Sequence, residues 1–195
     1  MASKSDKKLF LFDGMALAYR SHFALVNNPR MTSTGMNTSM VFVFTNTLLE
    51  IMIKEAPTHL AVVFDTDKPT YRDEIYSEYK ANRESMPEDI RAGFPYLDRV
   101  LAGFRVPVIR KDGYEADDVI GTLAHQATQA GRDAVISTGD KDMAQLVNGH
   151  ITLVNTMKEE TLDEAGVEEK FGLPPALIID FLALMGDKVD NIPGV

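Results

Sequence analysis

The chain has 195 residues, of which 45% are hydrophobic and 25% are charged, and it contains no cysteine. This composition fits one globular domain with a substantial core and excludes disulfides and thiolate metal sites. The formal net charge of −9 argues against a basic nucleic-acid surface, unless the negative charge gathers in one place. No apolar run is long enough to span a membrane. The polar N-terminal sequence MASKSDKK lacks the apolar core of a signal peptide, so we expect a cytoplasmic protein with no membrane partner.

Short apolar runs along the chain predict buried strands at residues 8–14, 58–67, 106–109, 132–142 and 150–156. Helices are expected between or after them, at residues 38–55, 88–104, 115–130 and 174–186. Strands that alternate with helices indicate an α/β fold with a mostly parallel central sheet flanked by helices. The polar segment 66–90 contains two prolines and is expected to leave the compact body as a loop or arch.

Acidic residues stand at the ends of these segments. Asp13, Asp65 and Asp140 each close a strand-like run, and ligands of open parallel sheets bind beyond the carboxyl ends of the strands. Six more acids open helices or follow the last apolar helix: Glu115, Asp117, Asp118, Asp142, Asp187 and Asp190. If these ends share one edge of the sheet, nine carboxylates face a single crevice.

Each of these acids has an ordinary structural explanation when it is considered alone. An Asp after a strand is commonly a turn or N-cap residue, and acids in the first turn of a helix complement its dipole. Three strands with the same ending and three further acidic groups fit independent turn chemistry poorly. Crowded carboxylates need cations, and carboxylate oxygens favour Mg²⁺ or Mn²⁺. Two such ions, about 3.5–4 Å apart, are the usual clamp for phosphodiester cleavage, and they would let an acidic chain attract phosphate.

The stretch YRDEIYSEYKANR, residues 71–83, interleaves aromatic and basic side chains. If it is helical, Arg72, Tyr76, Lys80 and Arg83 share one face, where they could stack on bases and hold phosphates. Residues 66–90 contain four basic and seven acidic residues. Composition alone therefore favours a solvated amphipathic helix with ordinary ion pairs.

Six segments together resemble the 5′-nuclease domain of bacterial DNA polymerase I, which belongs to the flap endonuclease superfamily. They are LFLFDG, VVFDTDKPTYRDEIYSEYKANR, GYEADDVIGTLA, ISTGDKDMAQLV, ITLVNT and LIIDFLALMGDKVDNIPGV. The resemblance runs from about residue 8 to the last residue, so 1–195 is expected to be one catalytic domain. It implies a PIN-like, flap-endonuclease-like fold with a helical arch at 66–90 over the acidic crevice.

The resemblance implies a Mg²⁺-dependent, structure-specific 5′-nuclease that cuts DNA at 5′ ends and 5′ flaps in replication and repair, acting as a monomer. The family's metal ligands match the nine carboxylates named above. Asp117 and Asp118 are also expected among the catalytic groups, with Lys80 and Arg83 steering the scissile phosphate. Tyr79 matches a base-stacking residue of the arch. The remaining match is Arg20, which corresponds to a phosphate-contacting arginine.

The chain stops at Val195, inside a helical DNA-binding motif that begins near residue 187, and the polymerase region of full-length relatives is absent. We therefore expect a fragment or a shortened gene product. Two alternatives stay open. One is a ribonuclease of the PIN type, which is usually smaller and lacks a long arch. The other is an inactive truncated module that binds metal, and DNA only weakly, without cutting.

Overall fold

Six strands form one sheet in the order β3-β2-β1-β4-β5-β6 in a computed structural model that describes residues 8–156 and 160–195. The strands are β1 (Lys8–Asp13), β2 (His59–Val63), β3 (Val108–Ile109), β4 (Asp133–Ser137), β5 (Ile151–Asn155) and β6 (Glu160–Leu162). All neighbours are parallel except β6, which runs antiparallel to β5. The five predicted strands and the mostly parallel sheet are confirmed. The polar residues 1–7, on which the signal-peptide expectation rests, lie outside the described residues.

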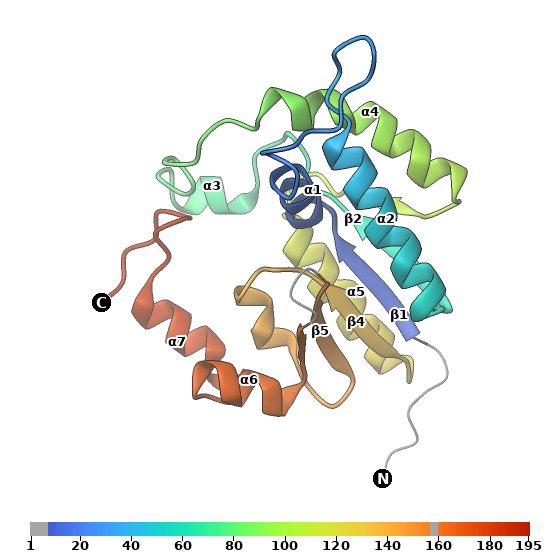
Figure 1. Ribbon diagram of the computed structural model, residues 1–195. Helices are drawn as coiled ribbons and strands as arrows, with labels where there is room; N and C mark the ends of the chain where they lie inside the picture. The colour runs from blue at the N-terminus through green and yellow to red at the C-terminus, as the bar shows by residue number, and fades with distance from the viewer. Residues whose placement is uncertain (1–7, 157–159) are drawn as a thin grey trace.

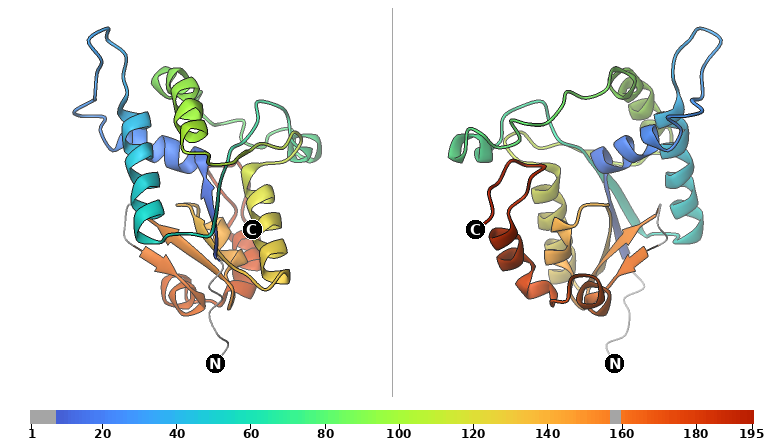
Figure 2. Two further views of the ribbon diagram at one scale, coloured as in Figure 1. Left: turned by 90° about the vertical axis from the view of Figure 1, so that its right-hand side faces the viewer. Right: turned by 60° about the vertical axis from the view of Figure 1, so that its left-hand side comes forward.

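Helices cover the sheet on both faces (Figures 1 and 2). The α-helices are α1 (Gly14–Phe23), α2 (Ser39–Lys54), α3 (Tyr71–Ile75), α4 (Glu88–Gly103), α5 (Ala116–Gln129), α6 (Glu164–Phe171) and α7 (Ile178–Met185), and 3₁₀ turns occupy η1 (Asp142–Leu146) and η2 (Pro175–Leu177). The predicted helices correspond to α2, α4 and α5, and to η2 followed by α7. Within the described ranges, no helix combines the length and the apolarity that a membrane crossing needs.

The core lies in two layers because successive residues of a strand point to opposite faces of the sheet. In β1, Phe10 and Phe12 pack into the layer formed with α1, α2 and α4, where Phe44 and Leu97 are buried. Leu11 packs into the other layer, against α5, η1 and α6. A strand that is buried on both faces explains the uninterrupted apolar run LFLF.

Residues 66–90, called the arch below, stand away from the sheet and rise across to α4 (Figure 1). A capping box between Thr70 and Asp73 starts α3, but this helix ends at Ile75 because Tyr76 adopts an extended backbone with φ of −142°. No residue of α3 is buried. Within residues 71–83 only Tyr71–Ile75 are α-helical, so Arg72 does not share a continuous helical face with Tyr76, Lys80 and Arg83.

Candidate metal centre beneath the arch

The acidic residues gather at the point where the strand order reverses. The chain proceeds from β1 to β2 and β3 on one side, and then places β4 and β5 on the other side of β1. Asp13 is the last residue of β1, and Asp140 follows β4 after two intervening residues. Crevices at such reversals, beyond the carboxyl ends of the strands, are where open α/β sheets bind their ligands.

Asp13 is held by hydrogen bonds to both carboxylate oxygens. Its Oδ1 accepts from the backbone N–H of Ala16 at 2.9 Å, which caps α1, and its Oδ2 accepts from the hydroxyl of Thr138 at 2.8 Å. Burial raises the pKa of the Asp13 carboxyl, and the negative charges of Asp65 and Asp140 act in the same direction, against the two hydrogen bonds. This carboxylate is therefore fixed in place at an electrostatically unfavourable position.

Asp117, in the first turn of α5, has the most crowded surroundings. Burial raises the pKa of its carboxyl to about 8, and the charges of Asp13, Asp140, Asp65 and Glu115 contribute in that order. Ionised carboxylates repel one another unless a cation lies between them. These five acids, contributed by three strand ends and one helix, therefore form one electrostatic group.

A second group surrounds Asp142, which begins η1. The pKa of Asp142 is raised to about 6, chiefly by burial and then by the charge of Asp140; Asp187 and Asp190 also raise it, whereas Lys141 lowers it. Asp140 thus belongs to both groups. The structure brings together all of the predicted acids except Asp118 around two adjoining centres of negative charge.

The start of α5 also confirms the ordinary structural role of its acids. Glu115 is the N-cap residue, and the Asp118 side chain accepts from the Glu115 backbone N–H at 3.1 Å in a capping box. The Asp65 Oδ1 accepts from the Ala116 N–H at 2.8 Å, which ties the end of β2 to the same helix. Helix capping therefore positions these carboxylates at the crevice.

Basic side chains of the arch approach the acids from above. Arg72 holds Asp118 with two hydrogen bonds, of 2.6 Å and 2.8 Å, and the Lys80 Nζ lies 2.6 Å from Glu115 Oε1. Arg83 pairs with Asp190. Asp118 therefore faces the arch, while Asp117 faces the other acids.

Tyr79 bridges two carboxylates from the arch. Its hydroxyl lies 3.1 Å from Glu115 Oε2 and 3.2 Å from Asp190 Oδ2. Burial, followed by these two negative charges, raises its pKa, so the hydroxyl stays protonated and can donate. The backbone N–H of Lys80 also donates to the Asp190 carbonyl at 3.0 Å. The arch is thus bound to the segment after α7, which rises to meet it in Figure 1.

A crevice of about 650 Å³ lies beneath the arch. Five of the nine acids line it: Glu115, Asp117, Asp140, Asp142 and Asp190. The predicted arch residues Tyr79, Lys80 and Arg83 line it as well. The other four acids are joined to this set through the contacts and charges described above.

Among the residues that the structure describes, no three acids or histidines form a ready-made metal-binding group. Basic side chains instead neutralise Glu115, Asp118 and Asp190, and the Lys141 Nζ lies 3.0 Å from Asp187 Oδ2. Burial is the largest cause of the raised pKa values of Asp13 and Asp117, and repulsion by neighbouring acids adds to it. The residues fit Mg²⁺ or Mn²⁺ in donor type, and their assignment as ligands stays a prediction.

Arg20 lies close enough to Asp13 for their charges to interact. Its Nε donates to the Ala16 carbonyl at 3.2 Å and its Nη1 to Asn155 Oδ1 at 3.0 Å, while its buried Nη2 has no partner in the described part of the chain. The predicted contact of Arg20 with phosphate stays a prediction. Sequence reasoning gave no site role to Thr138 or Lys141, because their partners, Asp13 and Asp187, lie far away in the sequence. It placed Arg72 among possible phosphate contacts, whereas in the structure Arg72 pairs with Asp118.

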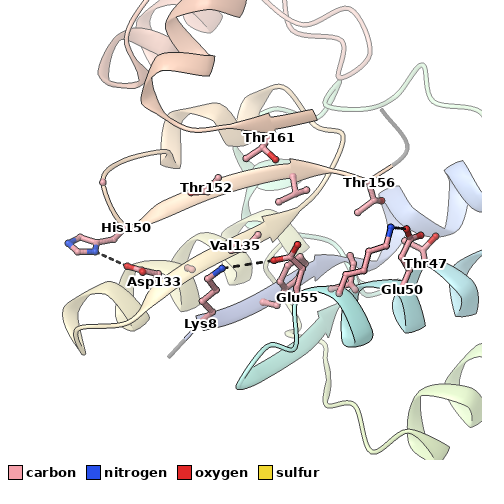
Figure 3. Close-up of a pocket in the computed structure, with 16 residues that line it drawn as sticks. Lys8, Thr47, Glu50, Glu55, Asp133, Val135, His150, Thr152, Thr156 and Thr161 are labelled. Atoms are coloured by element: carbon pink, nitrogen blue, oxygen red, sulfur yellow. Dashed lines mark hydrogen bonds and ion pairs between the residues drawn. The ribbon is translucent and has the colours of Figure 1, made fainter. Parts of the chain in front are cut away.

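A second cavity, of about 430 Å³, lies between α2 and the strands β4 and β5 (Figure 3). None of the predicted site residues lines it. Its charged side chains pair with one another, including His150 with Asp133 at 2.9 Å and Lys8 with Glu55 at 4.0 Å. The acidic crevice is therefore the better candidate for chemistry.

The sheet topology and the acidic crevice beneath the arch define a domain with a PIN-like fold. Residues 8–172 match the 5′-3′ exonuclease, N-terminal resolvase-like domain. The chain therefore belongs to the 5′-3′ exonuclease family and represents its N-terminal domain.

Two relatives and one solved structure illustrate the similarity. The chain is 55% identical to DNA polymerase I of Pseudomonas aeruginosa over 98% of its length, and it spans 21% of that protein. It is 40% identical to a 5′-3′ exonuclease of Aquifex aeolicus, over 97% of this chain and 65% of that one. A T5 5′-exonuclease with bound zinc ions shares the fold, with a TM-score of 0.78 at 20% identity over 97% of this chain and 70% of that chain.

Proposed function

We propose that this chain is the catalytic part of a divalent-metal-dependent, structure-specific 5′-nuclease that hydrolyses phosphodiesters at 5′ ends and 5′ flaps of DNA. The observation that carries the proposal is the meeting, at the sheet reversal and beneath basic side chains of the arch, of acids from three strand ends, the starts of α5 and η1, and the segment after α7. The family to which the chain belongs supports the same reaction. Because the chain spans only about a fifth of its DNA polymerase I relatives, its activity in isolation is part of the proposal.

Asp13, Asp65, Glu115, Asp117 and Asp140 would hold one Mg²⁺ or Mn²⁺, and Asp140 would share a second ion with Asp142, Asp187 and Asp190. Two ions bound there would activate a water molecule and stabilise the entering and leaving oxygens. Two different sets of acidic neighbours support this division. The pKa of Asp117 is raised by Asp13, Asp140, Asp65 and Glu115, whereas the pKa of Asp142 is raised by Asp140, Asp187 and Asp190.

The arch supplies the groups that would bind the substrate. Lys80 and Arg83 line the crevice, and their present partners, Glu115 and Asp190, are candidate ligands. If Glu115 and Asp190 held divalent cations, Lys80 and Arg83 would be free to bind the scissile phosphate and to offset its added charge in the transition state. The ring of Tyr79 would stack on an unpaired base.

The decisive experiment uses 5′-labelled flap DNA, with single-stranded RNA in parallel. Mg²⁺-dependent cleavage of the flap that EDTA stops supports the proposal. Lys80→Ala should reduce this cleavage strongly, whereas Lys170→Ala, which removes a lysine of α6 that pairs with Glu160, serves as the matched control. Cleavage of RNA alone would indicate a PIN-type ribonuclease. Metal binding with no cleavage of either substrate would indicate an inactive module.

A further inference from the structure

Thr138 follows β4 and is 3% exposed, and its hydroxyl lies between two of the acids. The hydroxyl is 2.8 Å from Asp13 Oδ2 and 3.0 Å from the backbone nitrogen of Asp140. An amide N–H can only donate, so the Thr138 oxygen accepts from Asp140 and directs its single proton to Asp13. The direction of both hydrogen bonds is therefore determined by chemistry.

The register of the sheet sets this contact. Phe12 of β1 is paired with Ser137 of β4, which brings the next residues, Asp13 and Thr138, side by side at the reversal. The backbone N–H of Thr138 donates to the Val154 carbonyl at 3.2 Å, so β5 supports it from the other side. Thr138 is thus tied to β1, β5 and the loop that carries Asp140.

Building on the proposed function, we propose that Thr138 is a positioning residue of the metal centre. Its hydroxyl fixes the orientation of the Asp13 carboxylate and couples the Asp140 backbone to it, so that the two acids keep a defined spacing for a divalent ion. We assign Thr138 an orienting role because its hydroxyl donates its single proton to Asp13 and accepts from the Asp140 backbone. Groups that orient metal ligands in this way typically change metal affinity by about 10–100-fold when they are removed.

A purely structural role for Thr138 makes a different prediction. If the hydroxyl only holds the loop after β4 in place through its hydrogen bonds, its loss would lower thermal stability and leave metal affinity unchanged. The neighbouring Ser137 offers a matched control, because it is 0% exposed and its hydroxyl has no hydrogen-bond partner among the described residues. Substitution of Ser137 by Ala deletes a buried oxygen next to Thr138 in the chain and breaks no hydrogen bond to Asp13 or Asp140.

The test compares Thr138→Val, Thr138→Ser and Ser137→Ala with the wild-type chain. Mn²⁺ affinity is measured by electron paramagnetic resonance, and unfolding in EDTA is measured by circular dichroism. We expect Thr138→Val to weaken Mn²⁺ binding by about 10–100-fold, and we expect Thr138→Ser and Ser137→Ala to bind as the wild type does. In cleavage assays, Thr138→Val should raise the Mg²⁺ concentration for half-maximal rate more than it lowers kcat at saturating Mg²⁺.

Unchanged Mn²⁺ affinity in Thr138→Val would overturn the inference, as would failure of Thr138→Ser to retain wild-type binding. Thr138→Ala provides a second hydroxyl deletion if the valine side chain prevents folding. The readouts separate this inference from the proposed function. A wild-type chain that binds Mn²⁺ but cuts no DNA contradicts the nuclease proposal and leaves the binding comparison decisive for Thr138. A wild-type chain that binds no Mn²⁺ contradicts both.

Discussion

Arg72 and Asp118 form a two-pronged ion pair between the arch and α5, with Nη1–Oδ2 and Nη2–Oδ1 distances of 2.6 Å and 2.8 Å. The pair joins residues 46 positions apart in the chain, and Asp118 is at the same time the capping partner of Glu115. The position of the arch is therefore coupled to the helix that presents Asp117 to the other acids.

Loss of this pair should release the arch. We expect Arg72→Ala to lower the free energy of unfolding by about 1 kcal/mol, since the pair is partly exposed, and to speed proteolytic cutting within residues 66–90. Arg72→Lys should restore the stability only in part, because an ammonium group cannot reproduce the planar two-pronged contact. Limited proteolysis and urea denaturation measure the two effects. If the arch of Arg72→Ala is cut no faster than that of Lys170→Ala, Arg72 does not hold it.

The stability of the metal-free protein should fall as the pH rises. The pKa values of Asp117 and Asp142 are raised to about 8 and about 6, so their contribution is complete below the ordinary carboxyl pKa and is lost as pH passes through 6 and then 8. The lowered pKa values of Asp118 and Asp187 act in the opposite direction, but only under acidic conditions. Thermal unfolding in EDTA between about pH 5 and pH 9 tests whether the unfolding midpoint falls as the pH rises. Added Mg²⁺ should make this fall smaller, because a cation favours the ionised acids. A midpoint that rises with pH in EDTA would contradict it.

Asp117→Asn should abolish cleavage and yet stabilise the metal-free fold. The substitution removes a carboxyl whose pKa burial and four acidic neighbours raise to about 8, so the gain in unfolding midpoint should be larger at about pH 9 than at about pH 6. Asp180→Asn, which changes an exposed acid of α7, is the control and should show no such pH-dependent gain. Retained turnover in Asp117→Asn would refute its assigned role at the metal centre.

Tyr79 is expected to act through its ring when DNA is bound and through its hydroxyl when DNA is absent. Tyr79→Phe removes the bridge between Glu115 and Asp190 but keeps the ring, so flap affinity should stay close to that of the wild type. Tyr79→Ala should weaken binding by about 1–3 kcal/mol if one base stacks there. Fluorescence anisotropy with flap DNA and Ca²⁺ in place of Mg²⁺ provides the measurement. Equal affinities of the two variants would exclude stacking.

The sequence by itself determined the sheet and the acids at its edge. Short apolar runs such as LFLF and AVIS are typical of strands that are buried on both faces of a parallel sheet, and the aspartates that follow such strands are expected at the carboxyl edge. Helices α1 and α6 and strand β6 were not predicted, because α1 begins at Gly14 directly after a strand, and the other two are short and largely polar.

Only the tertiary structure decided which side chains meet. Arch residues that sequence periodicity assigned to one helix come together instead because the chain turns after Ile75 and docks on the segment that carries Asp190. Thr138 reaches Asp13 across 125 positions through the register of β1 and β4. Periodicity reports local geometry, whereas these contacts depend on how distant segments are placed, and that placement follows from packing of the whole core.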